Sequence, residues 1–186
     1  MRDNIHYRTP ICSYLKLLTL FGLIFIVGAC TNDPQKRPSP LTLDSGMVGN
    51  TKLKIEYSSP SVRGRKIFGS GPDYLVQYGE MWRTGANDAT YITIDDVLQI
   101  NSVLFDSGSY SIFTIPGKDE WTVIFNKEWK QWGAYHYKDS LDVLRVDVPV
   151  QQLDSLAEKM RFFVEDDSLK FRWEHVGWAI DLTSLP

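Results

Sequence analysis

A two-residue alternation of apolar and polar side chains recurs in short segments along most of this chain. In KLKIEYS (residues 52–58), every second residue is apolar and the residues between are Lys or Glu. This period places alternate side chains on the two faces of a half-buried β-strand. It returns in YITID (91–95), LRVDV (144–148) and LKFRWE (169–174). The sequence therefore predicts a domain built mainly from short strands.

Turn residues join several of these segments into predicted hairpins. Asn101-Ser102 separates VLQI from VLF, and PGKDE (116–120) separates YSIFTI from WTVIFN. Pro and Gly supply the backbone angles that tight turns need. A third hairpin is expected to turn at residues 166–168. Short strands with this punctuation indicate an all-β, mainly antiparallel fold.

We expect a single-domain β-sandwich, with jelly-roll and immunoglobulin-like connectivity both left open and a closed barrel as the alternative architecture. At most one short helix is expected, over QQLDSLAEK (151–159), where Leu153, Leu156 and Ala157 would share one side.

The first thirty residues predict export and lipidation. Three basic residues precede an uncharged run of 13 residues that ends at Ala29. A membrane helix needs about 20 apolar residues, so this run is typical of a secretory signal peptide. Val27-Gly28-Ala29-Cys30 resembles the bacterial lipobox, in which the Cys becomes a lipidated N-terminus. A plain signal peptide and an uncut N-terminal anchor are the alternatives.

The domain organisation follows from this N-terminus. We expect a lipoprotein signal peptide over residues 1–29, a flexible tether over residues 30–40 that contains three Pro, and the β-sandwich over residues 41–186. Acyl chains on Cys30 would hold the protein on a membrane of the cell envelope. Thr31, rather than Asp, follows Cys30 and favours the outer membrane; the face remains open.

Charge argues against nucleic acid as a partner, and the cysteine content argues against an internal disulfide. The chain has 20 Lys and Arg and 23 Asp and Glu; removing residues 1–29 removes three basic and one acidic residue, which leaves a formal charge of −5. No basic stripe suits nucleic acid, so no DNA or RNA partner is expected. The two Cys residues are Cys12 and Cys30, so the mature domain contains no internal disulfide.

The common motifs of metal, nucleotide and hydrolase chemistry are absent from the sequence. There is no HExxH, no paired CxxC, no Walker loop, no GxGxxG after a strand and no GxSxG. We therefore predict no metal site and no cofactor. A catalytic site assembled in space from distant residues would escape such a search.

Four longer strings carry a family resemblance. YSSPSVRGRKIF (57–68), YGEMWRTGANDATYITI (78–94), DSGSYSIFTIPGKDEWTVIFNKEWKQWGAY (106–135) and DVLRVDV (142–148) together resemble domain-of-unknown-function family 2911. The family occurs largely in Bacteroidetes and related bacteria, often as exported or lipid-anchored proteins. The resemblance implies a mostly-β exported domain without assigned catalytic residues. The family usually carries Arg or Lys where this chain has Ser59.

YGEMWRTGANDAT (78–90) is the first candidate site. In a structural interpretation, Trp82 is a core aromatic, and Arg83 pairs with an acid or with loop carbonyls. In a functional interpretation, Arg83 and Asn87 donate to an anionic or polyhydroxylated ligand, and Trp82 forms an apolar wall.

Two further clusters add candidate residues. Arg63 and Arg65, with Lys66, would converge with Arg83 on a ligand or would protect an edge strand by their charge. Trp129 and Trp132 lie in an aromatic-rich segment that either packs in the core or presents flat faces to sugar rings.

Two functional classes follow. We expect a non-catalytic binding or interaction module on a lipid tether, which holds a glycan, another envelope component or a protein partner. The alternative is an envelope hydrolase or transferase in which His136 or His175 works with an acid such as Asp88 or Glu120.

Overall fold

The computed structural model describes residues 33–185, so the predicted signal peptide and Cys30 lie outside the described residues. Two one-turn 3₁₀ helices, η1 (Pro34–Lys36) and η2 (Asp139–Leu141), accompany the strands. The strands are β1 (Leu41–Val48), β2 (Thr51–Ser58), β3 (Lys66–Gly69), β4 (Tyr74–Gln77), β5 (Ala86–Ile94), β6 (Leu98–Ile100), β7 (Val103–Phe105), β8 (Gly108–Ile115), β9 (Glu120–Asn126), β10 (Asp142–Pro149), β11 (Gln151–Glu165) and β12 (Ser168–Ser184). Within these residues, no helix is long and apolar enough to cross a membrane.

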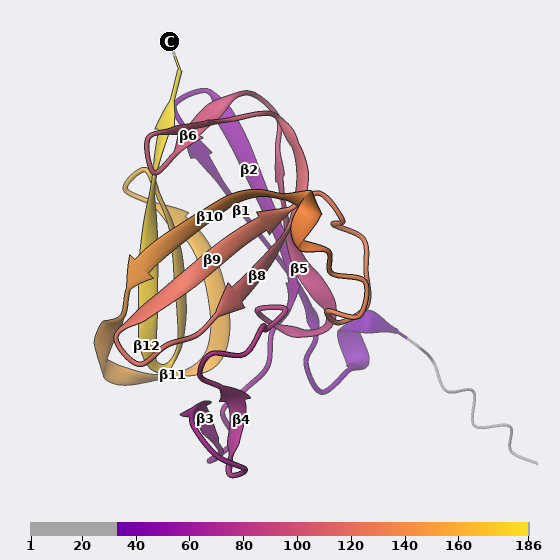
Figure 1. Ribbon diagram of the computed structural model, residues 1–186, viewed down its shortest axis with the longest axis vertical. Helices are drawn as coiled ribbons and strands as arrows, with labels where there is room; N and C mark the ends of the chain where they lie inside the picture. Colours follow the sequence, from indigo (N-terminus) through magenta and orange to yellow (C-terminus); the bar gives the residue numbers. More distant parts are fainter. Residues whose placement is uncertain (1–32, 186) are drawn as a thin grey trace, which may run out of the picture. The chain divides into compact units, whose positions relative to one another are not determined.

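The strands form two main antiparallel sheets, drawn in Figure 1. One has six strands in the order β1-β2-β5-β8-β9-β10, and the other has four in the order β11-β12-β6-β7. A small parallel pair, β3 and β4, stands apart from both sheets. The sheets do not close into a barrel, and the predicted all-β sandwich is confirmed.

The alternation read from the sequence explains which face of each strand is buried. Leu53, Ile55 and Tyr57 of β2 are buried, whereas Lys52 and Lys54 between them are exposed. The three predicted hairpins are present, as β6–β7, β8–β9 and β11–β12. The two turn residues Asp166 and Asp167 both have positive φ, as a tight two-residue hairpin turn requires.

Aromatic side chains fill the space between the two sheets. Trp82 stacks on Trp173 of β12 with ring centroids 5.8 Å apart, and its edge meets Phe68 and Trp121. Phe171 continues the cluster by stacking on Trp178 at 5.2 Å. Each such pair adds about 0.5–1.5 kcal/mol beyond the burial of its area. The sheets are therefore joined by an aromatic core.

The prediction of a helix over residues 151–159 is wrong, because these residues form the first part of the long strand β11. Gln151 pairs with Gly177 of β12, and the register then shifts on both sides of Ala157. Leu156 is about half exposed rather than buried with its neighbours. A nine-residue helix is marginal by itself, and pairing with β12 supplies hydrogen bonds that the helical pattern cannot outweigh.

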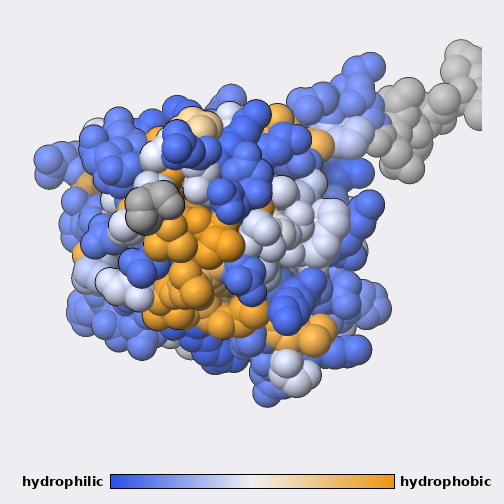
Figure 2. Space-filling model, turned by 90° about the horizontal axis from the view of Figure 1, so that it is seen from above, coloured by the Kyte–Doolittle hydropathy of each residue, from blue (hydrophilic) through white to orange (hydrophobic). Residues whose placement is uncertain are grey.

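The second sheet ends in a short, partly apolar edge. Val103 and Leu104 of β7 are exposed, and β7 is the last strand of its sheet. Figure 2 shows hydrophobic residues gathered on one face of the molecule. An edge strand can pair with other chains, but a strand of three residues offers few hydrogen bonds for this.

Candidate functional site

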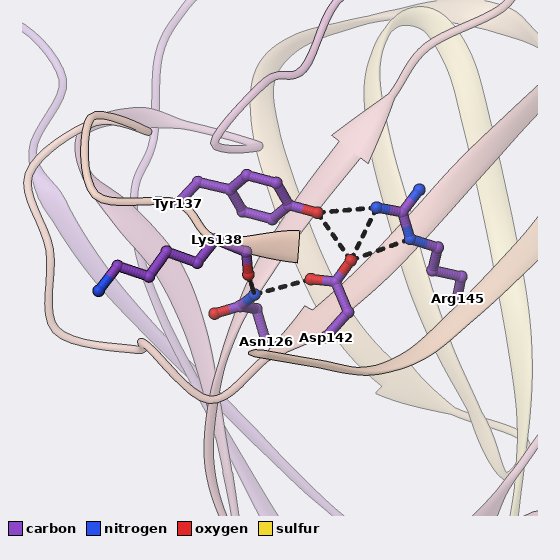
Figure 3. A network of polar contacts seen from close by, with 5 residues as sticks. All are labelled: Asn126, Tyr137, Lys138, Asp142 and Arg145. Carbon is purple, nitrogen blue, oxygen red and sulfur yellow. Dashed lines mark hydrogen bonds and ion pairs between the residues drawn. The ribbon is translucent and has the colours of Figure 1, made fainter. Parts of the chain in front are cut away.

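The loop between β9 and β10, residues 127–141, carries most of the exposed aromatic side chains. Its two ends are joined by the side chains of Asn126 and Asp142 (Figure 3). The Asn126 amide Nδ2 donates to the Asp142 carboxylate at 2.7 Å and to the Lys138 carbonyl at 2.8 Å. Because Asn126 is fully buried, these bonds satisfy a polar group that water cannot reach. The loop is thus closed by a buried polar clasp.

Tyr137 and Arg145 complete this polar clasp (Figure 3). The Tyr137 hydroxyl donates to Asp142 Oδ2 at 2.7 Å, and Arg145 Nη2 donates both to that oxygen at 2.7 Å and to the Tyr137 hydroxyl at 2.8 Å. Burial of the hydroxyl and its bond to Asp142 raise the pKa of Tyr137 from 10.0 to about 12. Its ring also packs edge-on against Phe113 of β8. The loop is anchored on both the polar and the apolar side.

The middle of the loop lies along the beginning of β5. Gly133 N–H donates to the Asn87 carbonyl and Ala89 N–H donates to the Gln131 carbonyl, each at 3.0 Å. The Gln131 side chain is buried and bonds to the carbonyl of Glu128 within the loop. The motif YGEMWRTGANDAT therefore supplies the backbone on which the aromatic loop is held.

A groove of about 290 Å³ opens between this loop and the outer face of the six-stranded sheet. The Trp129 ring meets Tyr91 at 5.0 Å, and Trp132 is 52% exposed. The surface of the groove is mainly apolar. Its lining residues are Leu41, Glu56, Asp88, Ala89, Tyr91, Trp129, Lys130, Gln131 and Trp132.

Two carboxylates and two cations, Arg37 and Lys130, stand among these aromatic rings. Burial and a hydrogen bond to Glu56 raise the pKa of Tyr91, so its hydroxyl stays protonated and directed at Glu56. Asp88 forms an ion pair with Arg37 at 3.4 Å, and the Arg37 guanidinium lies 5.9 Å from the centre of the Trp132 ring. The groove thus combines flat apolar faces with hydrogen-bond acceptors.

The residues before β1 are bound to the domain. The carbonyls of Pro38, Ser39 and Pro40 accept hydrogen bonds from Arg63 Nη2, Asn87 Nδ2 and Ser59 N respectively. Ser39 and Leu41 then line two different hollows. This short segment therefore contributes one residue to the wall of each hollow, the groove and a second cavity.

Asn87 and Arg63 have structural contacts that account for their presence. Asn87 has φ of 57°, a left-handed conformation that Asn tolerates, and its amide also donates to Ser58 Oγ at 3.2 Å. Arg63 donates its backbone N–H to Glu158. Both residues hold neighbouring segments of the chain together and line neither the groove nor the second cavity.

The second cavity, of about 280 Å³, brings Arg83 and Arg65 together. Trp82 belongs to the aromatic core, where its indole N–H donates to the Gly85 carbonyl at 3.1 Å, and it also contributes to the cavity wall. Lys66 lies elsewhere, beside Asp73. Of the four cations that sequence reasoning grouped, two converge.

Neither candidate catalytic His is paired with an acid in the described part of the chain. His175 Nδ1 lies 3.2 Å from the Leu153 carbonyl. The exposed His136 makes its hydrogen bond through its backbone N–H, which donates to Gln131. Residues 33–185 also contain no cluster of three His, Cys, Asp or Glu placed to hold a metal ion. The general acid–base alternative lacks its required geometry in these residues.

Comparison with known families decides the affiliation. The family described as "Protein of unknown function (DUF2911)" matches residues 39–182. This chain belongs to that family. The resemblance read from the sequence is thereby confirmed. No curated protein and no solved structure matches the chain.

The DUF2911 region contains every residue that lines the groove and the second cavity, whereas Arg37 lies before it. Trp129, Trp132 and Arg83 are candidate binding residues from the sequence alone, whereas Glu56 and Tyr91 are recognised as part of the groove only in the structure. These two residues face each other across β2 and β5. Each occupies an outward position in its alternating strand, but the register that joins them depends on the fold.

Tyr137→Phe tests the polar clasp through pH. The folded state holds the Tyr137 proton more tightly than the unfolded chain, because the pKa is raised from 10.0 to about 12. This contribution to the free energy of unfolding is full below about pH 10 and is lost as pH rises from about 10 to about 12. Urea unfolding at pH 9 to 12 should therefore show a smaller loss of stability across this window in Tyr137→Phe than in the wild type.

The exposed Tyr135 provides a matched control, since Tyr135→Phe should follow the wild-type curve. An equal loss of unfolding free energy between pH 10 and 12 in Tyr137→Phe and in the wild type would contradict a role of the Tyr137 hydroxyl in the clasp.

Proposed function

We propose that this DUF2911 protein is a non-catalytic binding module of the cell envelope, and that the groove between Trp129, Trp132 and Tyr91 binds a glycan. The observation that carries the proposal is a mainly apolar groove lined by two indoles, the partly buried Trp129 and the exposed Trp132, together with the carboxylates of Glu56 and Asp88. Sugar rings present C–H groups on their faces and hydroxyls at their edges. The groove offers an apolar surface for the C–H faces of the sugar and carboxylate acceptors for its hydroxyls.

The aromatic residues of the groove are held by packing and backbone pairing, which supports a role in ligand binding. Trp129 rests against Tyr91, and the backbone beside Trp132 is paired with Asp88 of β5. A preformed platform loses little conformational entropy when a ligand binds. Trp and Tyr also supply large contact areas with few rotatable bonds. These features favour an interaction site over a purely structural loop.

A lipid anchor at Cys30 would place this groove close to a membrane. Arg37, which contacts both Asp88 and Trp132, is seven residues after Cys30. Seven residues span at most about 25 Å when fully extended. We propose an outer-membrane anchor, with the groove held near the lipid surface and directed at glycans of the envelope.

Trp129→Ala and Trp132→Ala test the glycan site. In affinity electrophoresis of the purified protein through gels that contain envelope polysaccharide or peptidoglycan fragments, the wild type should be retarded by one of these polymers. Each variant should bind that polymer at least tenfold more weakly, a loss of about 1.4 kcal/mol, because it removes an apolar face.

Tyr135→Ala is the matched control, since Tyr135 is 82% exposed but does not line the groove. Its retardation should equal that of the wild type. Wild-type affinity in both Trp variants, or no retardation of the wild type by any envelope glycan, would direct the search to a protein partner.

Cys30→Ser tests the anchor. Without the thiol, the chain cannot be lipidated at this position, so the protein should fail to incorporate labelled palmitate. Cys12→Ser, a change within the predicted signal peptide, should be labelled as the wild type is. Incorporation of label by Cys30→Ser would contradict lipidation at Cys30.

A further inference from the structure

The second cavity has a chemistry unlike that of the groove. Its lining includes two Arg side chains, Arg65 and Arg83, and no acidic residue. The formal charge of the chain as a whole is −3. A hollow lined by cations alone among its charged groups therefore differs from the net negative charge of the chain.

Within residues 33–185, the Arg83 guanidinium has no acidic partner. Its Nε is buried and has no hydrogen-bond partner among the described residues. Burial lowers the pKa of Arg83, which means that its charge is poorly solvated. Arg does not lose its proton in proteins, so an external acceptor is what would relieve this cost.

Arg65 differs in a way that suits a second, supporting role. Its Nε and Nη2 donate to the carbonyls of Val62 and Ser61 at 3.1 and 2.6 Å. These bonds fix the plane of the guanidinium while its charge remains without an acidic partner among the described residues. Arg65 is thus a positioned cation at the cavity.

The backbone beside Arg83 is strained and firmly held. Thr84 has φ of 53°, which is unfavourable for a β-branched residue, and it is completely buried. Its hydroxyl lies 3.1 Å from Thr114 Oγ1, and its carbonyl accepts a hydrogen bond from Thr90 Oγ1 at 2.7 Å. Residues held in such strained backbone conformations cluster at active sites and ligand sites.

We propose that this cavity binds the carboxylate or phosphate group of a small ligand, with the Arg83 guanidinium as the principal donor and Arg65 as the supporting cation. A guanidinium presents N–H groups in a fixed fork that matches two oxygens of either anion. Leu75, Val76 and Trp82 provide an apolar wall for the body of the ligand. The site is separate from the glycan groove, since the two hollows share no lining residue.

Isothermal titration of the full chain in detergent tests this site with three sugars that share one ring type. Glucuronate carries a carboxylate, glucose 6-phosphate carries a phosphate, and glucose is neutral. At least one anionic sugar should bind tenfold or more tightly than glucose, and the stronger of the two identifies the anion. Arg83→Gln should abolish this preference, and Arg83→Lys, which keeps the charge but loses the fork, should retain part of it.

Two further variants separate this proposal from the glycan site and from misfolding. Trp132→Ala should bind the anionic sugar as the wild type does, whatever its effect on polysaccharide retardation. Leu75→Glu, at a half-exposed position of the cavity wall, should weaken anion binding at least tenfold by placing a carboxylate beside Arg83. No preference for either anion over glucose in the wild type would overturn the proposal. So would unchanged anion affinity in folded Arg83→Gln or, if that variant does not fold, in Leu75→Glu.

Discussion

Packing of Trp82 between the two sheets is the contact on which the rest of the structure depends. Its backbone exchanges two hydrogen bonds of 2.8 Å with Thr114 of β8, and its ring stacks on Trp173 of β12. One residue therefore connects both layers of the sandwich. Because Trp82 is fixed in this way, the turn that follows is held in place, and Arg83 is aimed at a cavity instead of being free to find an acidic partner.

The same short segment also organises the aromatic loop. Residues 87–89 pair with residues 131–133, while Asn126 and Asp142 close the loop at its ends. A scaffold of buried hydrogen bonds thus supports side chains whose faces remain in solvent. This division is typical of binding sites on β-sandwiches, where rigid strands carry recognition residues on their loops. The motif YGEMWRTGANDAT is accordingly both scaffold and part of a proposed site.

Much of the fold could be predicted from the sequence, because strand alternation and turn chemistry are local properties. The alternation in KLKIEYS is enough to predict which of its side chains are buried, and residues 166–168 are enough to predict the turn between β11 and β12. The failure over residues 151–159 shows the limit, since pairing with β12 outweighs a weak helical pattern. In the sites, Arg83, Trp129 and Trp132 are recognisable as residue types. The sequence does not reveal that the Asn87 side chain holds the Ser39 backbone by a hydrogen bond. The pairing of Glu56 with Tyr91 depends on the register between β2 and β5, which the sequence does not contain.

The ¹⁵N relaxation of the tryptophan indoles shows whether the aromatic groove is preformed. If the groove is preformed, the Trp129 indole, packed on Tyr91, is as ordered without any ligand as the core indole of Trp173, with an order parameter of about 0.85. Backbone amides of residues 127–141 should match those of β8 and β9. An order parameter below about 0.6 for Trp129 and this loop would mean that the groove is mobile and not preformed.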